Sequence, residues 1–189
     1  MRSFAIWIRW PAARSSFPEV LSMIIENAAQ EDVSDEYLEH CRGLMRESGW
    51  YVQAFMGPPA FCYTVGLAGV GIGATTDTEL LICGLDVRAM FGLLHAIHRK
   101  CEEERLRVRA GMRLEGSELA NVPLKLSLVS AQDAYSHMPL ARRLLGRQPW
   151  ALQVLWPDPK GVFPDEPGCE EPFASLQSLA LLRTQGALQ

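Results

Sequence analysis

The chain has 189 residues, of which 48% are hydrophobic and 21% charged, and its formal net charge is -4. This composition is that of an ordinary globular protein and excludes fibrous and low-complexity chains. The acidic balance argues against a strongly basic nucleic-acid-binding protein, and no apolar run reaches the roughly 18 residues of a membrane-spanning helix. We therefore expect a protein that does not enter the membrane.

Hydrophobic periodicity and breaker residues predict a series of elements in chain order. They are helices over 19–28, from Ser34 to Gly49, from Val87 to about Glu104, over 136–145 and over 175–182, and strands over 50–56, 61–67, 78–83, 105–113, 122–129 and 150–156. Ser34 and Asp86 are the expected N-caps, and the prolines at 58 and 59 predict a turn between two antiparallel strands.

This order of elements predicts an α+β fold with a mainly antiparallel sheet and packed helices. Whether the sheet curls into a barrel stays open. Length favours a single domain, which we assign to residues 19–172. Residues 1–18 form an N-terminal extension, in which Arg9 interrupts the only apolar stretch and argues against a signal peptide, and residues 173–189 form a C-terminal tail with a helical pattern.

Five cysteines are present, and no two have the C-x-x-C spacing of a zinc ribbon. An odd number without such spacing predicts reduced thiols and a cytoplasmic location. On the helix from Val87, His98 falls in the middle of the apolar stripe, and His95 falls along its edge together with Glu102. A metal could use these three residues, but the simpler interpretation is that His98 is a hydrogen-bonded core histidine and that His95 and Glu102 form a pair at the border of the core. We predict no metal and no cofactor.

Basic residues form two groups in the second half of the chain. The first holds Arg99, Lys100, Arg105, Arg107, Arg109 and Arg113 against Glu102, Glu103 and Glu104, and the second holds Arg142, Arg143 and Arg147. If both groups share a face, they predict binding of RNA or another polyanion. A solvated face offset by acidic neighbours is the alternative, and no RNA-binding motif with interleaved aromatic residues occurs.

The most distinctive segment runs from Gln153 to Gly168 and contains Trp156-Pro157-Asp158. Asp158 can close a turn on its own backbone, and Phe163 can fold back onto the core. The structural interpretation is a corner that pins the tail, and the functional one is the rim of a pocket. The candidate binding residues are Tyr63, Thr64, Glu79, Trp156, Asp158 and Phe163.

Three blocks of residues, Tyr63-Thr-Val-Gly-Leu67, Glu79-Leu-Leu-Ile-Cys-Gly-Leu85 and Gln153-Val-Leu-Trp-Pro-Asp158 with Gly161 and Phe163-Pro164, resemble the bacterial domain-of-unknown-function family numbered four-two-six-two. The resemblance covers about residues 34–172. It implies a compact bacterial cytosolic domain and no settled activity, cofactor or catalytic residue. This chain departs from the family pattern by a longer loop at 68–77 and by Thr78 in place of the proline before Glu79.

Three functional hypotheses remain. The first is a non-catalytic binding or interaction module, cytoplasmic and homodimeric, because no catalytic motif is present and aromatic residues are plentiful. The second is RNA binding through the basic groups at 99–113 and 142–147. The third is a small enzyme with a cleft near Tyr63, Glu79 and Asp158, although no nucleophile elbow supports it.

Overall fold

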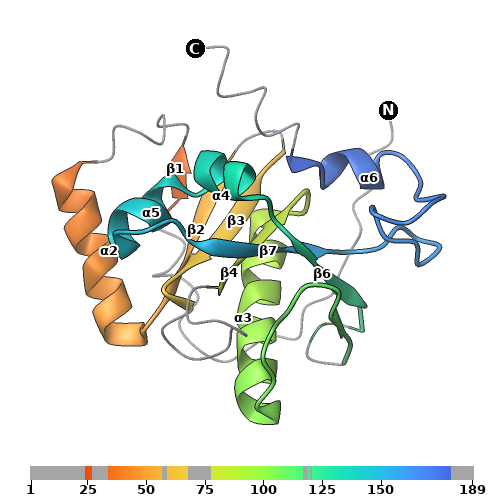
Figure 1. Ribbon diagram of the computed structural model, residues 1–189, viewed down its shortest axis with the longest axis horizontal. Coiled ribbons are helices and arrows are strands. Elements are labelled where there is room, and N and C mark those ends of the chain that lie inside the picture. The colour runs from red at the N-terminus through yellow and green to blue at the C-terminus, as the bar shows by residue number, and fades with distance from the viewer. Residues whose placement is uncertain are drawn as a thin grey trace.

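The structure is a computed structural model that describes residues 24–26, 34–56, 59–67, 78–116, 119 and 121–179. Its elements, labelled in Figure 1, are β1 (Ile24–Glu26), α2 (Asp35–Ser48), β2 (Tyr51–Met56), β3 (Phe61–Val65), β4 (Thr78–Cys83), α3 (Val87–Glu104), β5 (Arg113–Leu114), β6 (Leu124–Leu128), α4 (Ala131–His137), α5 (Pro139–Leu145), β7 (Trp150–Leu155) and α6 (Phe173–Leu176).

The seven strands form one sheet in the order β1-β2-β3-β4-β7-β6-β5. The pairs β1/β2 and β4/β7 are parallel, and the other four pairs are antiparallel. The predicted α+β fold with a mainly antiparallel sheet is therefore confirmed. The sheet is open, with β1 at one edge and β5 at the other, so it does not close into a barrel.

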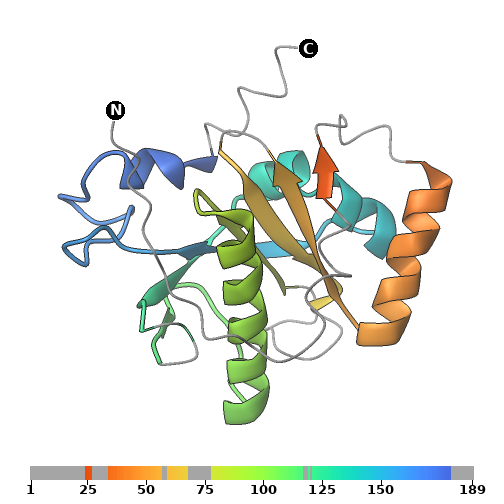
Figure 2. The same ribbon diagram turned by 180° about the vertical axis from the view of Figure 1, so that it is seen from behind.

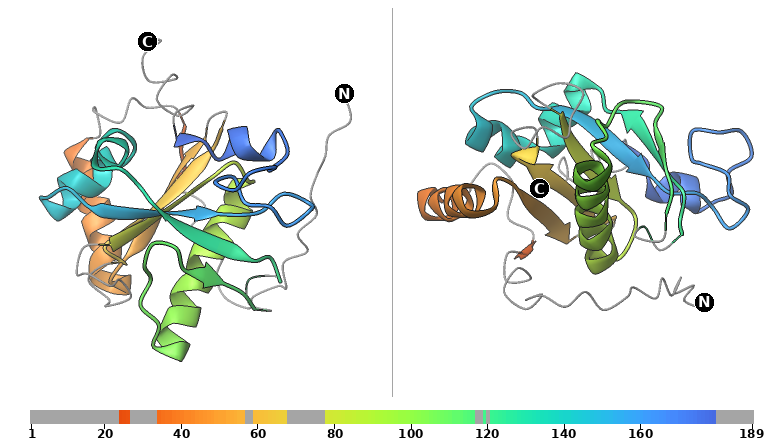
Figure 3. Two further views of the ribbon diagram at one scale, coloured as in Figure 1. Left: turned by 45° about the vertical axis from the view of Figure 1, so that its right-hand side comes forward. Right: turned by 90° about the horizontal axis from the view of Figure 1, so that it is seen from below.

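Helices cover both faces of the sheet. Helix α3 packs on one face, and α2, α4 and α5 pack on the other, as the opposite views in Figures 1 and 2 and the view from below in Figure 3 show. Because successive side chains of a strand point to opposite faces, Leu80 and Ile82 contact the α3 side while Leu81 and Cys83 contact the other side. All six residues of β4 are buried, as expected of a central strand covered on both faces.

Two predicted helix caps are confirmed. The side chain of Ser34 accepts a hydrogen bond from the N–H of Tyr37, and that of Asp86 accepts one from the N–H of Arg88. Each cap satisfies a main-chain donor that the first helical turn leaves open. Gly49 ends α2 in the left-handed conformation, as predicted.

Two predicted helices were wrong in part. The helical pattern over 19–28 overlaps β1, which pairs in parallel with β2, so tertiary pairing overrides the local pattern there. The single helix expected over 136–145 is two helices, α4 and α5. They separate at Met138, with φ -125°, because Pro139 starts a new helix.

The N-terminal extension, residues 1–18, lies outside the described residues. The C-terminal tail contains α6, which begins and ends earlier than the predicted helix over 175–182. None of the helices in the described part of the chain is long and apolar enough to cross a membrane.

Candidate functional site

The carboxylate of Glu79 is fully buried at the start of β4. Thr64 Oγ1 donates to its Oε2 over 2.6 Å, and the main-chain N–H groups of Gly66 and Leu67 donate to Oε1 and Oε2 over 3.0 and 3.1 Å. These bonds engage both oxygens of the carboxylate and fix the turn that follows β3.

The hydroxyl of Thr64 also acts as an acceptor. The N–H of Leu80 donates to Thr64 Oγ1 over 2.8 Å, one residue beyond the last pair of the β3/β4 register, Tyr63 with Leu81. The side chain therefore replaces a main-chain bond where the two strands separate. Thr64 and Glu79 together close the end of the sheet rather than presenting free groups to a substrate.

Asp158 is buried and organises the loop after β7. Its Oδ1 accepts from the N–H groups of Lys160 and Val162, both over 2.9 Å, and its Oδ2 accepts from the N–H of Glu170 over 3.0 Å. The Glu170 contact makes the largest contribution to lowering the pKa of Asp158. One side chain thus closes the neck of the loop between residues 158 and 170.

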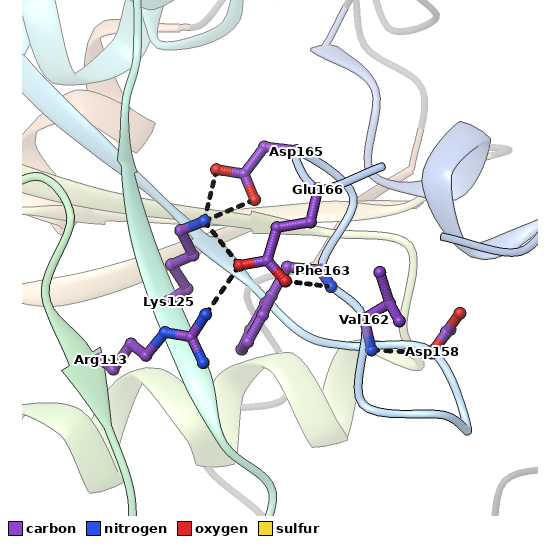
Figure 4. Close-up of polar contacts among 7 residues, drawn as sticks. All are labelled: Arg113, Lys125, Asp158, Val162, Phe163, Asp165 and Glu166. Carbon is purple, nitrogen blue, oxygen red and sulfur yellow. Dashed lines mark hydrogen bonds and ion pairs between the residues drawn. The ribbon is translucent and has the colours of Figure 1, made fainter. Parts of the chain in front are cut away.

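Phe163 attaches the same loop to β5 and β6 (Figure 4). Its ring is buried and lies beneath two cations, with Arg113 Cζ 4.9 Å and Lys125 Nζ 5.7 Å from the ring centroid. Ion pairs surround it: Glu166 meets Arg113 at 2.7 Å and Lys125 at 3.1 Å, and Asp165 meets Lys125 at 2.9 Å. The hydrogen bond from Lys125, first among several contacts, lowers the pKa of Glu166.

Trp156 joins the end of β7 to the end of β4. Its indole Nε1 donates to Cys83 O over 3.0 Å. Gln177, which the sequence did not single out, pairs with the main chain of Trp156 in both directions: Oε1 accepts from its N–H over 2.9 Å and Nε2 donates to its carbonyl over 2.8 Å. Gln153 Nε2 donates to Gln177 O over 2.5 Å, so side-chain hydrogen bonds hold the segment after α6 against β7.

The six predicted binding residues do not form one cluster. Glu79 lies at the start of β4 beside Ala151, whereas Trp156 bonds to Cys83 at the other end of β4. Asp158 is seven residues beyond Ala151, a separation on the order of 20 Å in an extended chain. The structure brings Thr64 together with Glu79, and Phe163 together with the loop that Asp158 closes. It does not bring Glu79 and Asp158 into one cleft.

Tyr63 belongs to a third place, the face covered by α2 and α5. There Tyr37 Oη donates to Gln53 Oε1 over 2.9 Å, and Cys41 lies against the phenols of Tyr37 and Tyr51. Burial raises the pKa of the Cys41 thiol and of Tyr63. A thiol with a raised pKa is a poor nucleophile, so this polar cluster is built for packing. Local sequence patterns did not predict this cluster, because its residues come from separate elements of the chain.

All five cysteines are free, as predicted. Burial raises the pKa of both Cys62 and Cys83 to about 12, which keeps them as thiols at neutral pH. The chemistry of a catalytic cysteine requires the opposite shift.

Both histidines of α3 pack against Trp50, His98 stacked and His95 tilted, and Glu102 pairs with His98 instead of with His95 as predicted. The ring centroids of His95 and His98 lie 4.7 and 4.5 Å from that of Trp50, and His98 Nδ1 lies 3.3 Å from a Glu102 oxygen. Desolvation lowers the pKa of His95 to about 4, although part of its side chain stays exposed, and it also lowers the pKa of His98. No group of three metal-ligating side chains occurs among the described residues.

The two basic groups lie on opposite sides of the sheet. The first follows the C-terminal half of α3, and Arg142 and Arg143 are on α5, which covers the other face (Figures 1 and 2). They therefore do not form one continuous basic surface. The guanidinium of Arg142 lies 4.0 Å from the centroid of the Tyr135 ring, so its contact is with the neighbouring helix α4 on the same face of the sheet.

Comparison with known proteins gives one match. Residues 44–170 match the model of a family described as Domain of unknown function (DUF4262). Neither the search of curated proteins nor that of solved structures found a match. The matched range contains β2 to β7, α3 to α5 and the loop closed by Asp158, and it stops before α6. The match confirms the resemblance expected from the three sequence blocks and spans well over half of the residues, so the chain belongs to the DUF4262 family.

Proposed function

We propose that this protein is a cytoplasmic, non-catalytic interaction module that acts as a homodimer through an apolar surface at one end of the sheet. Leu128 at the end of β6 is 60% exposed and Trp150 at the start of β7 is 61% exposed. This pair of large exposed side chains is the observation that carries the proposal.

The register places the two side chains next to each other. Leu128 pairs with Leu152 across the antiparallel β6/β7 ladder, and Trp150 lies two residues before Leu152 on the same face. Diagonal neighbours of this kind lie about 7–8 Å apart, within reach of an indole ring. Leu152 itself is buried beside them, so the exposed pair continues the apolar surface of the core.

An apolar pair of this kind suits a second copy of the same chain. Around a two-fold axis each patch meets its own equivalent, and apolar surfaces need no complementary charge. A specific interface buries about 800 Å² on each partner, with aromatic anchors at its centre. We expect Trp150 to be that anchor and Leu128 to flank it.

The polar residues support the non-catalytic part of the proposal. Both oxygens of Glu79 and both oxygens of Asp158 accept hydrogen bonds from within the chain. A general base needs a free lone pair directed at a substrate, and neither carboxylate has the exposure for that role. Free cysteines are consistent with the reducing cytoplasm.

Sedimentation velocity over a range of protein concentrations tests the proposal. The wild-type protein should sediment as a dimer, and Trp150→Glu and Leu128→Glu should each weaken association by at least tenfold, because a charge would be buried at the interface. Tyr135→Glu is the control, since Tyr135 is 52% exposed but lies on α4. A wild-type monomer at every concentration, or equal effects of all three variants, would refute the proposal.

A further inference from the structure

The C-terminal half of α3 carries a regular series of side-chain pairs with its glutamates, of which the two with Arg99 and Lys100 are ion pairs. His98 pairs with Glu102 at 3.3 Å, Arg99 with Glu103 at 3.8 Å and Lys100 with Glu104 at 2.5 Å. Each pair joins residues four positions apart, which face each other on a helix. All three glutamates of the last turn are thereby engaged with a base one turn earlier.

Three arginines after the helix have no such partner. Arg113 is engaged with Glu166, but Arg105, Arg107 and Arg109 are exposed and form no ion pair with another described residue. The unpaired positive charge of this region is therefore concentrated on three arginines at alternate positions, Arg105, Arg107 and Arg109. It stands out because the whole chain has a net charge of -4.

The backbone directs these three side chains outward. Val108 is fully buried in an isolated β-bridge, and Leu106 packs against the core on the α3 side. In an extended chain alternate residues face the same side, at about 6.6–6.8 Å for every two residues. Arg107 and Arg109 consequently project together, and Arg105 precedes them at the end of α3.

Backbone conformation does not explain why an arginine occupies position 105. This residue ends α3 in the left-handed conformation, with φ 54° and ψ 35°, and its N–H bonds to the carbonyls of Cys101 and Glu102. Glycine adopts that conformation most easily, and a residue with a Cβ is strained there. The sequence nevertheless places a long cation at this position, exposed to solvent.

We propose that Arg105, Arg107 and Arg109, here called the arginine strip, bind the phosphodiester backbone of single-stranded RNA. The planar guanidinium forms paired hydrogen bonds with phosphate oxygens, and all three residues are arginine rather than lysine. Arg107 and Arg109 project from one side of an extended stretch and Arg105 precedes them at the end of α3, so three cations follow one another along the chain, as successive phosphates do along a single strand. This binding goes beyond the proposed homodimer and uses none of the residues of its interface.

The second basic group does not extend the strip. Arg142 and Arg143 belong to α5 on the opposite face of the sheet. They provide a matched control, because neutralising Arg142, Arg143 and Arg147 changes the net charge by the same amount as neutralising the three residues of the strip.

Fluorescence anisotropy with a labelled twelve-nucleotide oligouridylate, titrated at several salt concentrations, tests the strip. The wild-type protein should bind with a log–log salt slope of about -2, since three phosphate contacts on a single strand contribute about -0.7 each. Replacing all three residues of the strip by glutamine should abolish the slope and weaken binding at least tenfold. Replacing Arg142, Arg143 and Arg147 by glutamine should leave both quantities within twofold of wild type.

Three results would overturn the proposal. They are salt-independent or absent binding by the wild type, equal losses in the two triple variants, and tighter binding of a polyglutamate peptide than of the oligouridylate at equal length. The last would identify an acidic protein segment as the partner. Urea midpoints check that both triple variants fold, and Arg105→Gly, which removes one cation while relieving backbone strain, should weaken RNA binding without lowering the midpoint. Sedimentation of the strip variant should still show the dimer, so failure of either proposal is distinguishable.

Discussion

A single methyl group at Gly84 is expected to displace the C-terminal segment from the sheet. Gly84 follows β4 with φ +84°, and a Cβ at this position would lie 2.5 Å from Leu176 O and 2.9 Å from its carbonyl carbon. Both are main-chain atoms of α6, so they cannot rotate away as a flexible side chain would. We therefore expect Gly84→Ala to separate α6 from the end of β4.

The expected loss in the free energy of unfolding follows from the backbone strain at position 84 and from the hydrogen bonds that are lost when α6 moves away. The left-handed conformation costs an alanine about 1–2 kcal/mol relative to glycine. Displacing Gln177 removes its two bonds with Trp156 and the bond that its carbonyl accepts from Gln153. At about 0.5–1.5 kcal/mol net for each bond, the total loss in the free energy of unfolding comes to roughly 3–6 kcal/mol.

Gly161 is the matched control, because it has the same φ of +84° and no atom within 4 Å of its would-be Cβ. Gly161→Ala should cost only the conformational part, about 1–2 kcal/mol. Urea denaturation of both variants measures the difference, and hydrogen exchange locates it at residues 173–179. Equal losses in the two variants would refute the reasoning. In the Gly84→Ala background, Gln177→Ala should cost less than it does in wild type.

Two further predictions concern buried polar groups. Thr64→Val removes a donor to Glu79 and the acceptor of the Leu80 N–H. It should lower the free energy of unfolding by about 2–4 kcal/mol in urea denaturation, because two buried partners lose a hydrogen bond. Thr64→Ser keeps the hydroxyl and should lose much less, and similar losses in the two variants would contradict this role of the hydroxyl. The lowered pKa values of His95 and His98 mean that the unfolded chain binds protons more readily, so stability is complete above pH about 6.5 and falls as the pH drops toward 4. Urea midpoints at pH 7.5 and 5 should therefore differ in wild type and converge in the His95→Asn/His98→Asn double variant, and an unchanged pH dependence in that variant would contradict the assignment.

Local signals in the sequence predicted much of the fold. The helix α3 has a capping aspartate and a long apolar stripe, and β4 is a short apolar run, so both were found with their bounds. The β2/β3 hairpin followed from two aromatic strands around prolines. By contrast, β1 exists because β2 offers an edge in space, and no local pattern carries that information.

The site was harder to predict because its residues act through the backbone. The turn role of Asp158 was expected from its side chain, and the structure shows it closing a longer loop by reaching Glu170. Gln177 acts through a pairing with Trp156 across 21 positions. The association of Glu79 with Asp158 failed for a simple reason: two parallel strands place their starts together and their ends together, and these residues belong to opposite ends.

The parallel pairing of β4 with β7 has a consequence for synthesis. Thr78 pairs with Trp150, which is 72 positions later in the chain, since 150 minus 78 is 72. At 5–20 residues per second, roughly 4–14 s pass between the emergence of the two strands from the ribosome. During that interval one edge of β4, a strand that is buried on both faces in the folded protein, has no native neighbour. An unpaired strand edge of this kind can pair with other nascent chains. The helix α3, which leaves the ribosome directly after β4 and needs only local contacts to form, can cover one face of β4 during this interval, while the edge that β7 will occupy stays open.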